Sequence, residues 1–132
     1  MVDVADAHVV IDTDLVVDFL RGHDPGRSFV RAAIHGRRAR FTTVSAFELR
    51  LGGDFEERRD RLASLLTRRT ISLDVRSALL AGEIHRSLLA QGRPIGVGDA
   101  MIAGICRCHE LPLATRNVRH FERVPGLRLV TV

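Results

Sequence analysis

Short apolar runs alternate along this chain with longer segments in which apolar residues recur every three or four positions. The apolar runs predict short buried strands over residues 8–12, 38–43, 111–115 and 127–132, with a further short strand over 70–73. The helical spacing predicts helices over residues 13–22, 27–36, 44–53, 54–69 and 74–92, and a last helix that begins at Asp99. Strands that alternate with helices in this way indicate an α/β fold with a mainly parallel sheet.

Two of the predicted helices indicate which of their sides faces the core. In residues 54–69 the apolar side chains that gather on one side are Phe55, Leu62, Leu65 and Leu66. In residues 74–92 the predicted inner face consists of Val75, Leu79, Ile84 and Leu88. Residues 116–126 are expected to form a loop with a turn, because their apolar residues show neither the helical nor the strand period.

Length and composition limit the class of protein. The 132 residues are enough for one domain with its own core, and the linkers are too short to indicate a second domain. No apolar stretch is long enough to span a bilayer. The opening residues MVDVADA carry acids and lack the basic region of a secretory signal, so we expect a cytoplasmic protein that does not enter a membrane.

The chain is basic and its positive charge is carried by one residue type. The net charge is +4, and all 20 basic residues are arginine. This balance suits a phosphate-rich or acidic partner. Cys106 and Cys108 stand two positions apart on a predicted helix and so point to opposite sides. We therefore expect free thiols rather than a local disulfide or half of a zinc site.

Asp12, Glu48 and Asp99 each occupy a position where an acid commonly caps a helix. Asp12 lies between the first predicted strand and the first helix. Glu48 follows Ser45 by three residues and fits the S-x-x-E capping box. Asp99 stands directly before the apolar run AMIAGIC. Taken one at a time, the three acids are predicted to be helix caps.

The predicted fold gives the same acids a second interpretation. Asp12 follows the first strand, Glu48 lies in the first turn after the second, and Asn117 follows strand 111–115 by two residues. The helix of Asp99 must pack on the same sheet. Because the carboxyl ends of parallel strands lie along one edge, these side chains are placed where they can converge.

Converging carboxylates repel one another unless a cation lies between them. Mg²⁺ prefers oxygen ligands and combines one or two carboxylates with water and substrate phosphate. A site of this kind polarises a phosphodiester and lowers the pKa of the attacking water. The reaction class indicated by this interpretation is metal-assisted hydrolysis of a phosphodiester.

Four blocks of the sequence resemble a known family in order and spacing. They are VVIDTDLVVDFLRG, TTVSAFELRLGG, GRPIGVGDAMIAGIC and LPLATRNVRHFERVPGL. Together they resemble the PIN-domain ribonucleases, in particular the VapC-type toxins of bacterial and archaeal toxin–antitoxin pairs. The resemblance implies a PIN-like three-layer αβα sandwich with a mainly parallel central sheet. It places a single PIN domain over residues 8–132, after an N-terminal extension over residues 1–7.

The resemblance also implies roles for individual residues. It places the metal site on Asp12, Glu48 and Asp99, and the fourth catalytic position on Asn117, where some members have Asp. Supporting roles fall on three neighbours of these residues, Thr13, Asp14 and Thr115. The implied cofactor is Mg²⁺ or Mn²⁺. The implied activity is endonucleolytic cleavage of structured RNA of translation, tRNA or rRNA, by a homodimer that a cognate VapB-like antitoxin inhibits.

Three arginines are candidates for contact with RNA. Arg116 and Arg119 flank Asn117, and Arg50 follows Glu48 on the same predicted helix. A guanidinium can bind phosphate through two parallel hydrogen bonds. The chain has six Phe and neither Trp nor Tyr, so we expect recognition of RNA backbone and shape rather than stacking of bases on an aromatic platform. For His120, contact with substrate and a purely structural loop position both stay open.

Two other functions compete with the metal-dependent ribonuclease. The segment VVIDTDLV also fits the D-x-D-x-[TV] opening of haloacid-dehalogenase-like phosphatases, in which Asp12 would be the nucleophile. The later acid of that family is missing after GDAMIAG, and its usual Lys does not occur in this chain. A non-catalytic PIN scaffold that binds RNA or a protein partner is the second alternative, favoured by Asn117 alone.

Overall fold

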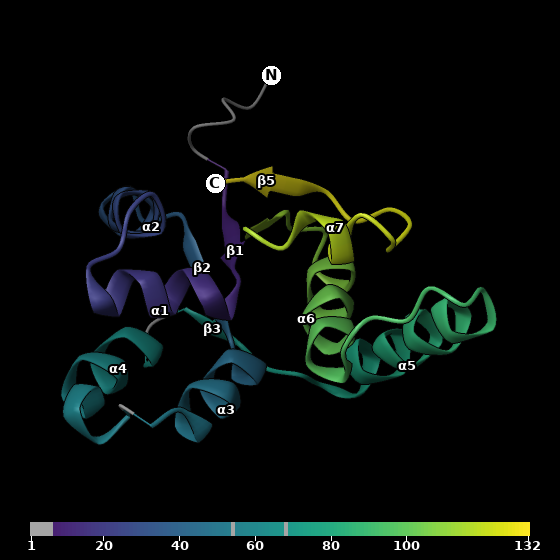
Figure 1. The fold of residues 1–132 in the computed structure, drawn as a ribbon, viewed down its shortest axis with the longest axis horizontal. Helices are drawn as coiled ribbons and strands as arrows, with labels where there is room; N and C mark the ends of the chain where they lie inside the picture. Colours follow the sequence, from purple (N-terminus) through teal and green to yellow (C-terminus); the bar gives the residue numbers. More distant parts are fainter. Residues whose placement is uncertain (1–6, 54, 68) are drawn as a thin grey trace.

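The fold is a parallel sheet between two layers of helices (Figure 1), shown here in a computed structural model that describes residues 7–53, 55–67 and 69–132. The predicted N-terminal extension lies outside these residues except for Ala7. The strands are β1 (Val9–Ile11), β2 (Ala39–Thr42), β3 (Thr70–Ile71), β4 (Leu113–Thr115) and β5 (Leu129–Thr131). The helices are α1 (Thr13–Arg21), α2 (Gly26–His35), α3 (Thr43–Leu51), α4 (Arg59–Leu66), α5 (Val75–Ala90), α6 (Val97–Cys108) and α7 (Val118–Phe121).

All five predicted strands are present, and every pair of neighbouring strands is parallel. The strand order is β3-β2-β1-β4-β5, so β1 is central. Its residue Val10 lies opposite Arg40 of β2 on one side and Leu113 of β4 on the other. The first strand in the sequence is therefore held in place by a strand from the last fifth of the chain.

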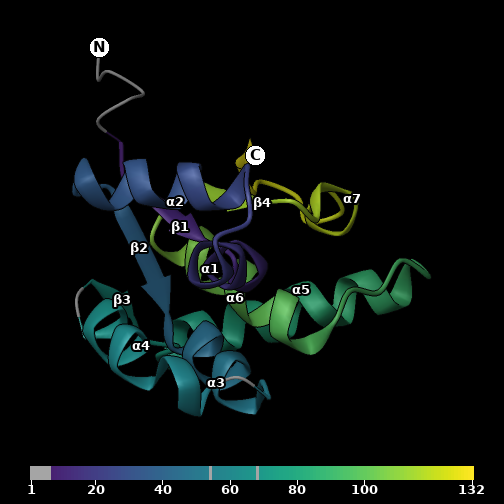
Figure 2. The ribbon, with the colours of Figure 1, turned by 60° about the vertical axis from the view of Figure 1, so that its left-hand side comes forward.

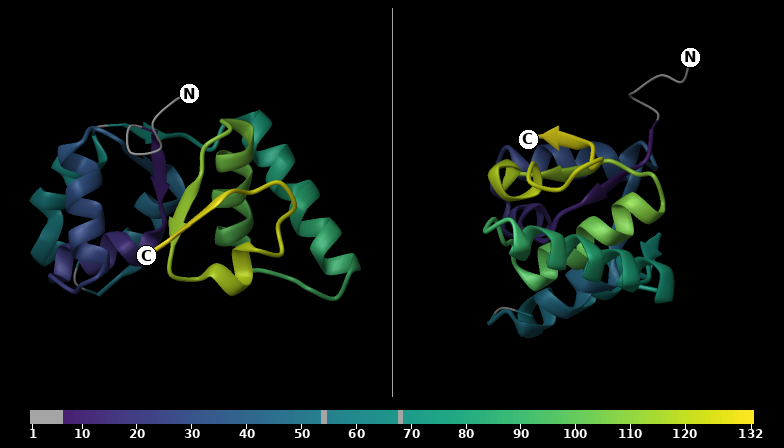
Figure 3. Two further views of the ribbon diagram at one scale, coloured as in Figure 1. Left: turned by 90° about the horizontal axis from the view of Figure 1, so that it is seen from above. Right: turned by 90° about the vertical axis from the view of Figure 1, so that its right-hand side faces the viewer.

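Alternation along β1 divides the core into two halves. Val9 and Ile11 pack with buried residues of α1, α2 and α4, whereas Val10 packs with those of α5 and α6. Both faces of the sheet are thus covered, as is usual for parallel sheets. Figure 3 (left) shows the helices on the two sides of the strands. The predicted three-layer arrangement is confirmed.

The predicted capping roles are confirmed for only one of the three acids. Asp12 is the N-cap of α1, and its Oδ1 accepts a hydrogen bond from the Thr13 amide at 2.8 Å. The N-cap of α3 is Thr42, whose Oγ1 accepts from the Ser45 amide at 3.1 Å. Glu48 therefore lies beyond the first turn, and the predicted capping box is wrong. Asp99 is the third residue of α6, so its predicted capping role is also wrong.

Two other predictions differ from the structure. The predicted loop 116–126 contains the short helix α7, whose Phe121 is buried against α6. The predicted helix 54–69 consists of a 3₁₀ turn over Glu56–Arg58 followed by α4, with residues 54 and 68 outside the described part. In the 54–69 segment, Leu62 is nevertheless buried as predicted, and Phe55, Leu65 and Leu66 are partly buried against the same core.

The inner face of α5 is only partly as predicted. Ile84 and Leu88 are buried, but Val75 and Leu79 are 76% and 67% exposed. The reason is that α5 approaches α6 very closely at Gly104. A Cβ atom there would lie 2.7 Å from the Ser77 carbonyl oxygen, so small side chains form this part of the contact. Within the described ranges no helix is both long and apolar enough to cross a bilayer.

Candidate active site at the carboxyl edge of the sheet

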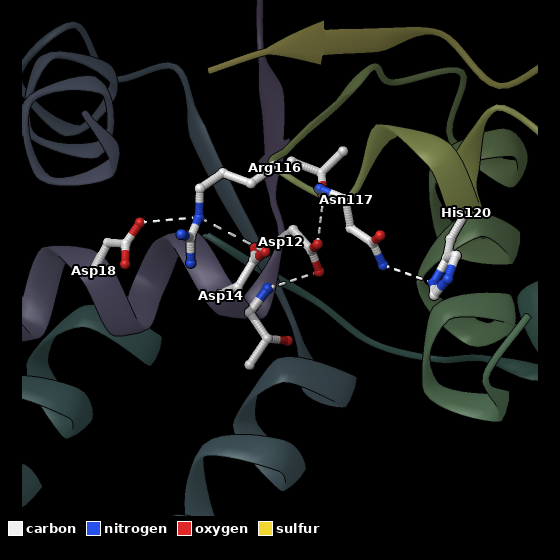
Figure 4. Close-up of polar contacts among 8 residues, drawn as sticks. Asp12, Asp14, Asp18, Arg116, Asn117 and His120 are labelled. Atoms are coloured by element: carbon white, nitrogen blue, oxygen red, sulfur yellow. Dashed lines mark hydrogen bonds and ion pairs between the residues drawn. The ribbon is translucent and has the colours of Figure 1, made fainter. Parts of the chain in front are cut away.

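The central strands β1 and β4 end side by side, and polar side chains follow both ends. Asp12 comes directly after β1, and Thr115 is the last residue of β4. Thr115 donates a hydrogen bond from Oγ1 to Asp12 Oδ2 at 2.7 Å, and both side chains are buried. Figure 4 shows Asp12 among the residues that follow these strands. The strand pairing therefore brings together residues 103 positions apart, as we predicted for this edge.

Asp12 is a buried carboxyl group with an altered acidity. The residue is 5% exposed, and burial raises the pKa of its carboxyl group to about 7. The negative charge of Asp14 raises this pKa further, and that of Asp99 adds a smaller effect. The hydrogen bonds from Thr115 and Thr13 act in the opposite direction. Burial and the neighbouring carboxylates thus outweigh these hydrogen bonds and disfavour the ionised form of Asp12.

Glu48 is positioned by the first turn of α1. Thr13 donates from Oγ1 to Glu48 Oε1 at 2.7 Å, and the same Oγ1 lies 2.8 Å from Ser45 Oγ. The other carboxylate oxygen faces the start of α6, where a Cβ atom on Gly98 would lie 3.0 Å from Oε2. Gly98 thus leaves room for the carboxylate beside the amino end of a helix, where negative charge is favourable.

Asp99 lies next to Gly98 and completes the group of acids. Burial raises the pKa of its carboxyl group, and the negative charge of Glu48 raises it further. His120 acts in the opposite direction, with Nδ1 3.8 Å from Asp99 Oδ2. The electrostatic effects that connect Asp12, Asp14, Asp99 and Glu48 show that four acids from the start of α1, from α3 and from the start of α6 share one region.

Asn117 and His120 form a pair beside these acids. The Asn117 backbone amide donates to Thr115 Oγ1 at 2.9 Å, which fixes the residue at the end of β4. Its side-chain Nδ2 lies 2.8 Å from His120 Nδ1, and the amide Nδ2 donates this hydrogen bond to the ring (Figure 4). The amide oxygen Oδ1 is then the atom left to bind a ligand. The three-residue spacing between Asn117 and His120 is the sequence signal that could have placed His120 beside Asn117.

Only one of the three predicted RNA-contacting arginines touches an acid of this region. Arg116 Nε lies 3.9 Å from Asp14 Oδ2 and 3.1 Å from Asp18 Oδ2. Arg50 instead pairs with Glu56 at 3.7 Å and lies over the ring of Phe55. Arg119 is exposed on α7. Sequence reasoning overlooked Asp18, although its four-residue spacing from Asp14 places both on one side of α1.

The residues present fit a divalent cation. Asp14 Oδ1 is buried and has no hydrogen-bond partner among the described residues. This orphaned oxygen and the raised pKa values of Asp12 and Asp99 indicate surplus negative charge that a cation would neutralise. Within the described ranges, no group of three or more His, Cys, Asp or Glu side chains is arranged so that it could hold a metal ion. Such an open site suits an ion that keeps water and substrate oxygens among its ligands.

Comparison with known proteins gives a consistent result over nearly the whole chain. The model of the PIN domain family matches residues 9–127. A tRNA(fMet)-specific endonuclease VapC from Shigella flexneri is 31% identical over 124 residues, which are 90% of this chain and 93% of that protein. Ribonuclease VapC10 from Mycobacterium tuberculosis is 31% identical over 120 residues, covering 91% of this chain and 90% of that protein.

Solved structures with the same fold include toxin–antitoxin complexes. A DNA-bound VapBC from Salmonella typhimurium matches with a TM-score of 0.77 and 25% identity, covering 95% of this chain and 98% of that one. VapBC2 from Rickettsia felis, bound to a DNA fragment from its promoter, also has a TM-score of 0.77, at 19% identity, with 94% and 98% covered.

Proposed function

This chain belongs to the PIN domain family and has VapC ribonucleases as relatives, and on that premise we propose that it is a metal-dependent endoribonuclease, the toxin of a toxin–antitoxin pair. We propose that it cleaves structured RNA of translation, tRNA or rRNA, in the cytoplasm, and that residues 8–132 act as one domain. The observation that carries this proposal is the buried Asp12, whose pKa is raised among other carboxyl groups at the edge of the sheet.

The proposed roles follow from the contacts of each side chain. Asp12, Asp99 and Glu48 would hold Mg²⁺ or Mn²⁺, and Asn117 would add its amide oxygen. Thr115 and Thr13 orient Asp12 and Glu48 through hydrogen bonds of 2.7 Å. Asp14 adds negative charge, and its buried Oδ1 is free to accept from a bound water. When bound, the ion would supply charge stabilisation at the phosphate and a water of lowered pKa.

The experiment that tests this function is RNA cleavage by the purified chain at several concentrations of Mn²⁺ and Mg²⁺. We expect cleavage of tRNA or rRNA that disappears with EDTA and returns with added metal, and products that carry a 5′-phosphate. Cleavage that persists in EDTA would contradict the metal-dependent mechanism. Binding of RNA without cleavage at any metal concentration would favour the non-catalytic scaffold. A covalent phosphate on Asp12 would favour the phosphatase.

A groove on the other side of α1 supports the proposed protein partner. It has a volume of about 1030 Å³ and lies between α1, α2 and α4, on the side of the sheet that Figure 2 brings forward. Apolar side chains such as Phe19, Ile34 and Leu65 line it, and Arg61 and Arg69 lie beside them. An amphipathic segment with acidic residues complements this surface. We propose that the antitoxin occupies it.

Arg61→Glu should weaken inhibition by the proposed cognate antitoxin by about tenfold or more, because it reverses charge at the groove. Arg61 is exposed, and the variant loses only its contact with the Phe19 ring and a long hydrogen bond to the Leu20 carbonyl, so the fold should survive at a small cost in stability. The measurement is the rate of RNA cleavage as a function of antitoxin concentration. Arg86→Glu, at an exposed position of α5, is the matched control. Equal inhibition of both variants would place the antitoxin elsewhere.

Exposed apolar side chains support the proposed homodimer. Phe47 and Leu51 on α3 are 63% and 71% exposed, and Val75 and Leu79 lie exposed on α5. Each pair has four-residue spacing, and both helices contact α6. A second copy of the chain would cover these side chains. Sedimentation velocity of the chain and of Leu51→Asp checks this, since a dimer through α3 should dissociate in the variant.

A further inference from the structure

Asp18 is a buried carboxylate that the proposed metal site does not use. It lies one turn after Asp14 on α1, and its side chain is 10% exposed. Its Oδ2 lies 3.1 Å from Arg116 Nε, whereas the Asp14 carboxylate is 3.9 Å from the same nitrogen. In Figure 4 the Arg116 guanidinium lies between these two carboxylates. Asp18 is therefore the nearer of the two anions that hold this arginine.

The position of Asp18 is fixed by the start of α2. Gly26 is the first residue of that helix, and a Cβ atom built on it would lie 2.4 Å from Asp18 Oδ2 and 2.6 Å from Asp18 Cβ. No other side chain fits at residue 26 without moving the carboxylate. The Asp18 side chain thus packs tightly against backbone, and it can serve as a rigid point of attachment for Arg116.

Arg116 is attached at both ends but keeps part of its guanidinium available. Its backbone follows Thr115, which donates to Asp12, and precedes Asn117. Both carboxylates approach the guanidinium most closely at Nε, and the side chain is 47% exposed. The two Nη groups are therefore the donors left for a ligand. A guanidinium whose Nε is held by a carboxylate can still bind phosphate through its Nη groups.

We propose that Asp18 is a positioning residue that holds the Arg116 guanidinium beside the catalytic acids, so that its Nη groups bind a phosphate of the RNA backbone next to the cleaved bond. This inference rests on the proposed ribonuclease function. Without Asp18, the nearest anion for Arg116 is Asp14, and the guanidinium would move onto the acids that should bind the metal. Asp18 thus contributes to RNA binding indirectly, because its ion pair holds the Arg116 guanidinium where it can bind the RNA phosphate.

The direction of the change in RNA affinity distinguishes the positioning role of Asp18 from a general effect of its charge. Asp18→Asn removes a negative charge from a basic protein, and a charge effect alone would tighten binding of RNA. Positioning predicts the opposite, a weakening of about tenfold, similar to that of Arg116→Ala. Glu83→Gln, which removes an exposed acid on α5, is the matched control and should bind RNA as tightly as the parent chain or more tightly.

The test is the affinity for a fluorescently labelled tRNA, measured by anisotropy in EDTA at several salt concentrations. The chains compared are the parent, Asp18→Asn, Arg116→Ala, the double variant and Glu83→Gln. We expect the double variant to bind no more weakly than Arg116→Ala, because Asp18 acts through that residue. In both Arg116→Ala and Asp18→Asn the affinity for RNA should depend less on salt concentration, by the amount expected for the loss of about one phosphate contact. In cleavage assays, Asp18→Asn should raise KM more than it lowers kcat.

Three results would overturn the proposal. Tighter or equal binding by a folded Asp18→Asn, additive losses in the double variant, or unchanged affinity in Arg116→Ala each exclude positioning through Arg116. If Asp18→Asn does not fold, the NMR signal of the Arg116 Nε–H in the parent chain decides. It should be protected from exchange and keep its shift when tRNA binds, and rapid exchange excludes the anchor. A parent chain that neither binds nor cleaves RNA refutes the ribonuclease function itself.

Discussion

Asp12→Asn should abolish metal-dependent RNA cleavage and at the same time make the protein harder to unfold at pH 8. The loss of cleavage should be about a thousandfold or more, because a bound metal supplies several kcal/mol of transition-state stabilisation. The fold should survive, because Asn can still accept the hydrogen bond from the Thr13 amide and is nearly the same size. Cleavage assays and thermal unfolding of the metal-free chains provide both measurements.

The gain in stability depends on pH in a defined direction. The pKa of Asp12 is about 7 in the folded chain and 3.8 in an ordinary environment, so the folded state binds more protons between these values. The stability of the metal-free parent should therefore fall as the pH rises from about 4 to 7. The full shift corresponds to about 4 kcal/mol. Asp12→Asn has no such group, so its advantage should be small at pH 5 and about 5 °C or more at pH 8.

Added metal should stabilise one of the two proteins and not the other. Mn²⁺ should raise the unfolding temperature of the parent chain at pH 8 and leave that of Asp12→Asn nearly unchanged. Asp60→Asn, the same substitution at an exposed position of α4, is the matched control and should keep both cleavage and metal response. If Asp12→Asn cleaves as fast as the parent, Asp12 is a helix cap only and the proposed site is wrong.

Gly104→Ala should destabilise the fold although alanine favours helices. The new Cβ would lie 2.7 Å from the Ser77 carbonyl oxygen and 2.8 Å from Ala81 Cβ, so α5 and α6 must move apart. Overpacking of this kind costs about 1–3 kcal/mol, which exceeds the helix-propensity gain of about 1 kcal/mol. The free energy of unfolding from urea titration measures the difference.

Gly82→Ala provides the matched control on the neighbouring helix. Gly82 lies inside α5, is exposed, and has no atom within 4 Å of the position of an added Cβ. The same substitution should therefore stabilise the protein there by about 1 kcal/mol. A loss of stability in both variants would mean that α5 is sensitive to any substitution, and the close contact at Gly104 would not be the cause.

The sequence predicted the sheet and its polar edge because both follow from local patterns. Five short apolar runs became five parallel strands, and residues directly after strands, such as Asp12, were bound to lie at the carboxyl edge. The hydrogen bond from Thr115 to Asp12 follows from the pairing of β1 with β4. Glu48 and Asp99, which local pattern alone would have assigned as caps, were indicated by the predicted fold and by the resemblance to a family.

The errors arose where contacts distant in sequence decide the outcome. Val75 and Leu79 fit an apolar stripe, but the close approach of α6 at Gly104 selects the small residues of α5 instead. The start of α6 at Val97 rather than at Asp99 depends on extended backbone at Gly96. Asp18 had no visible partner in the sequence, since Arg116 lies 98 positions later and reaches it only in the folded chain.

The groove and the candidate active site are built from different parts of the chain, and this sets the order in which their residues are synthesised. The groove residues between Phe19 and Arg69 leave the ribosome early, whereas Asp99, Thr115 and Asn117 come from the last third of the chain. The bond between Thr115 and Asp12 spans 103 positions, and contacts so far apart form late in folding. A growing chain therefore contains all residues of the proposed antitoxin surface before it contains those of the complete site. On the proposed function, this order would give an antitoxin time to bind before the nuclease is complete.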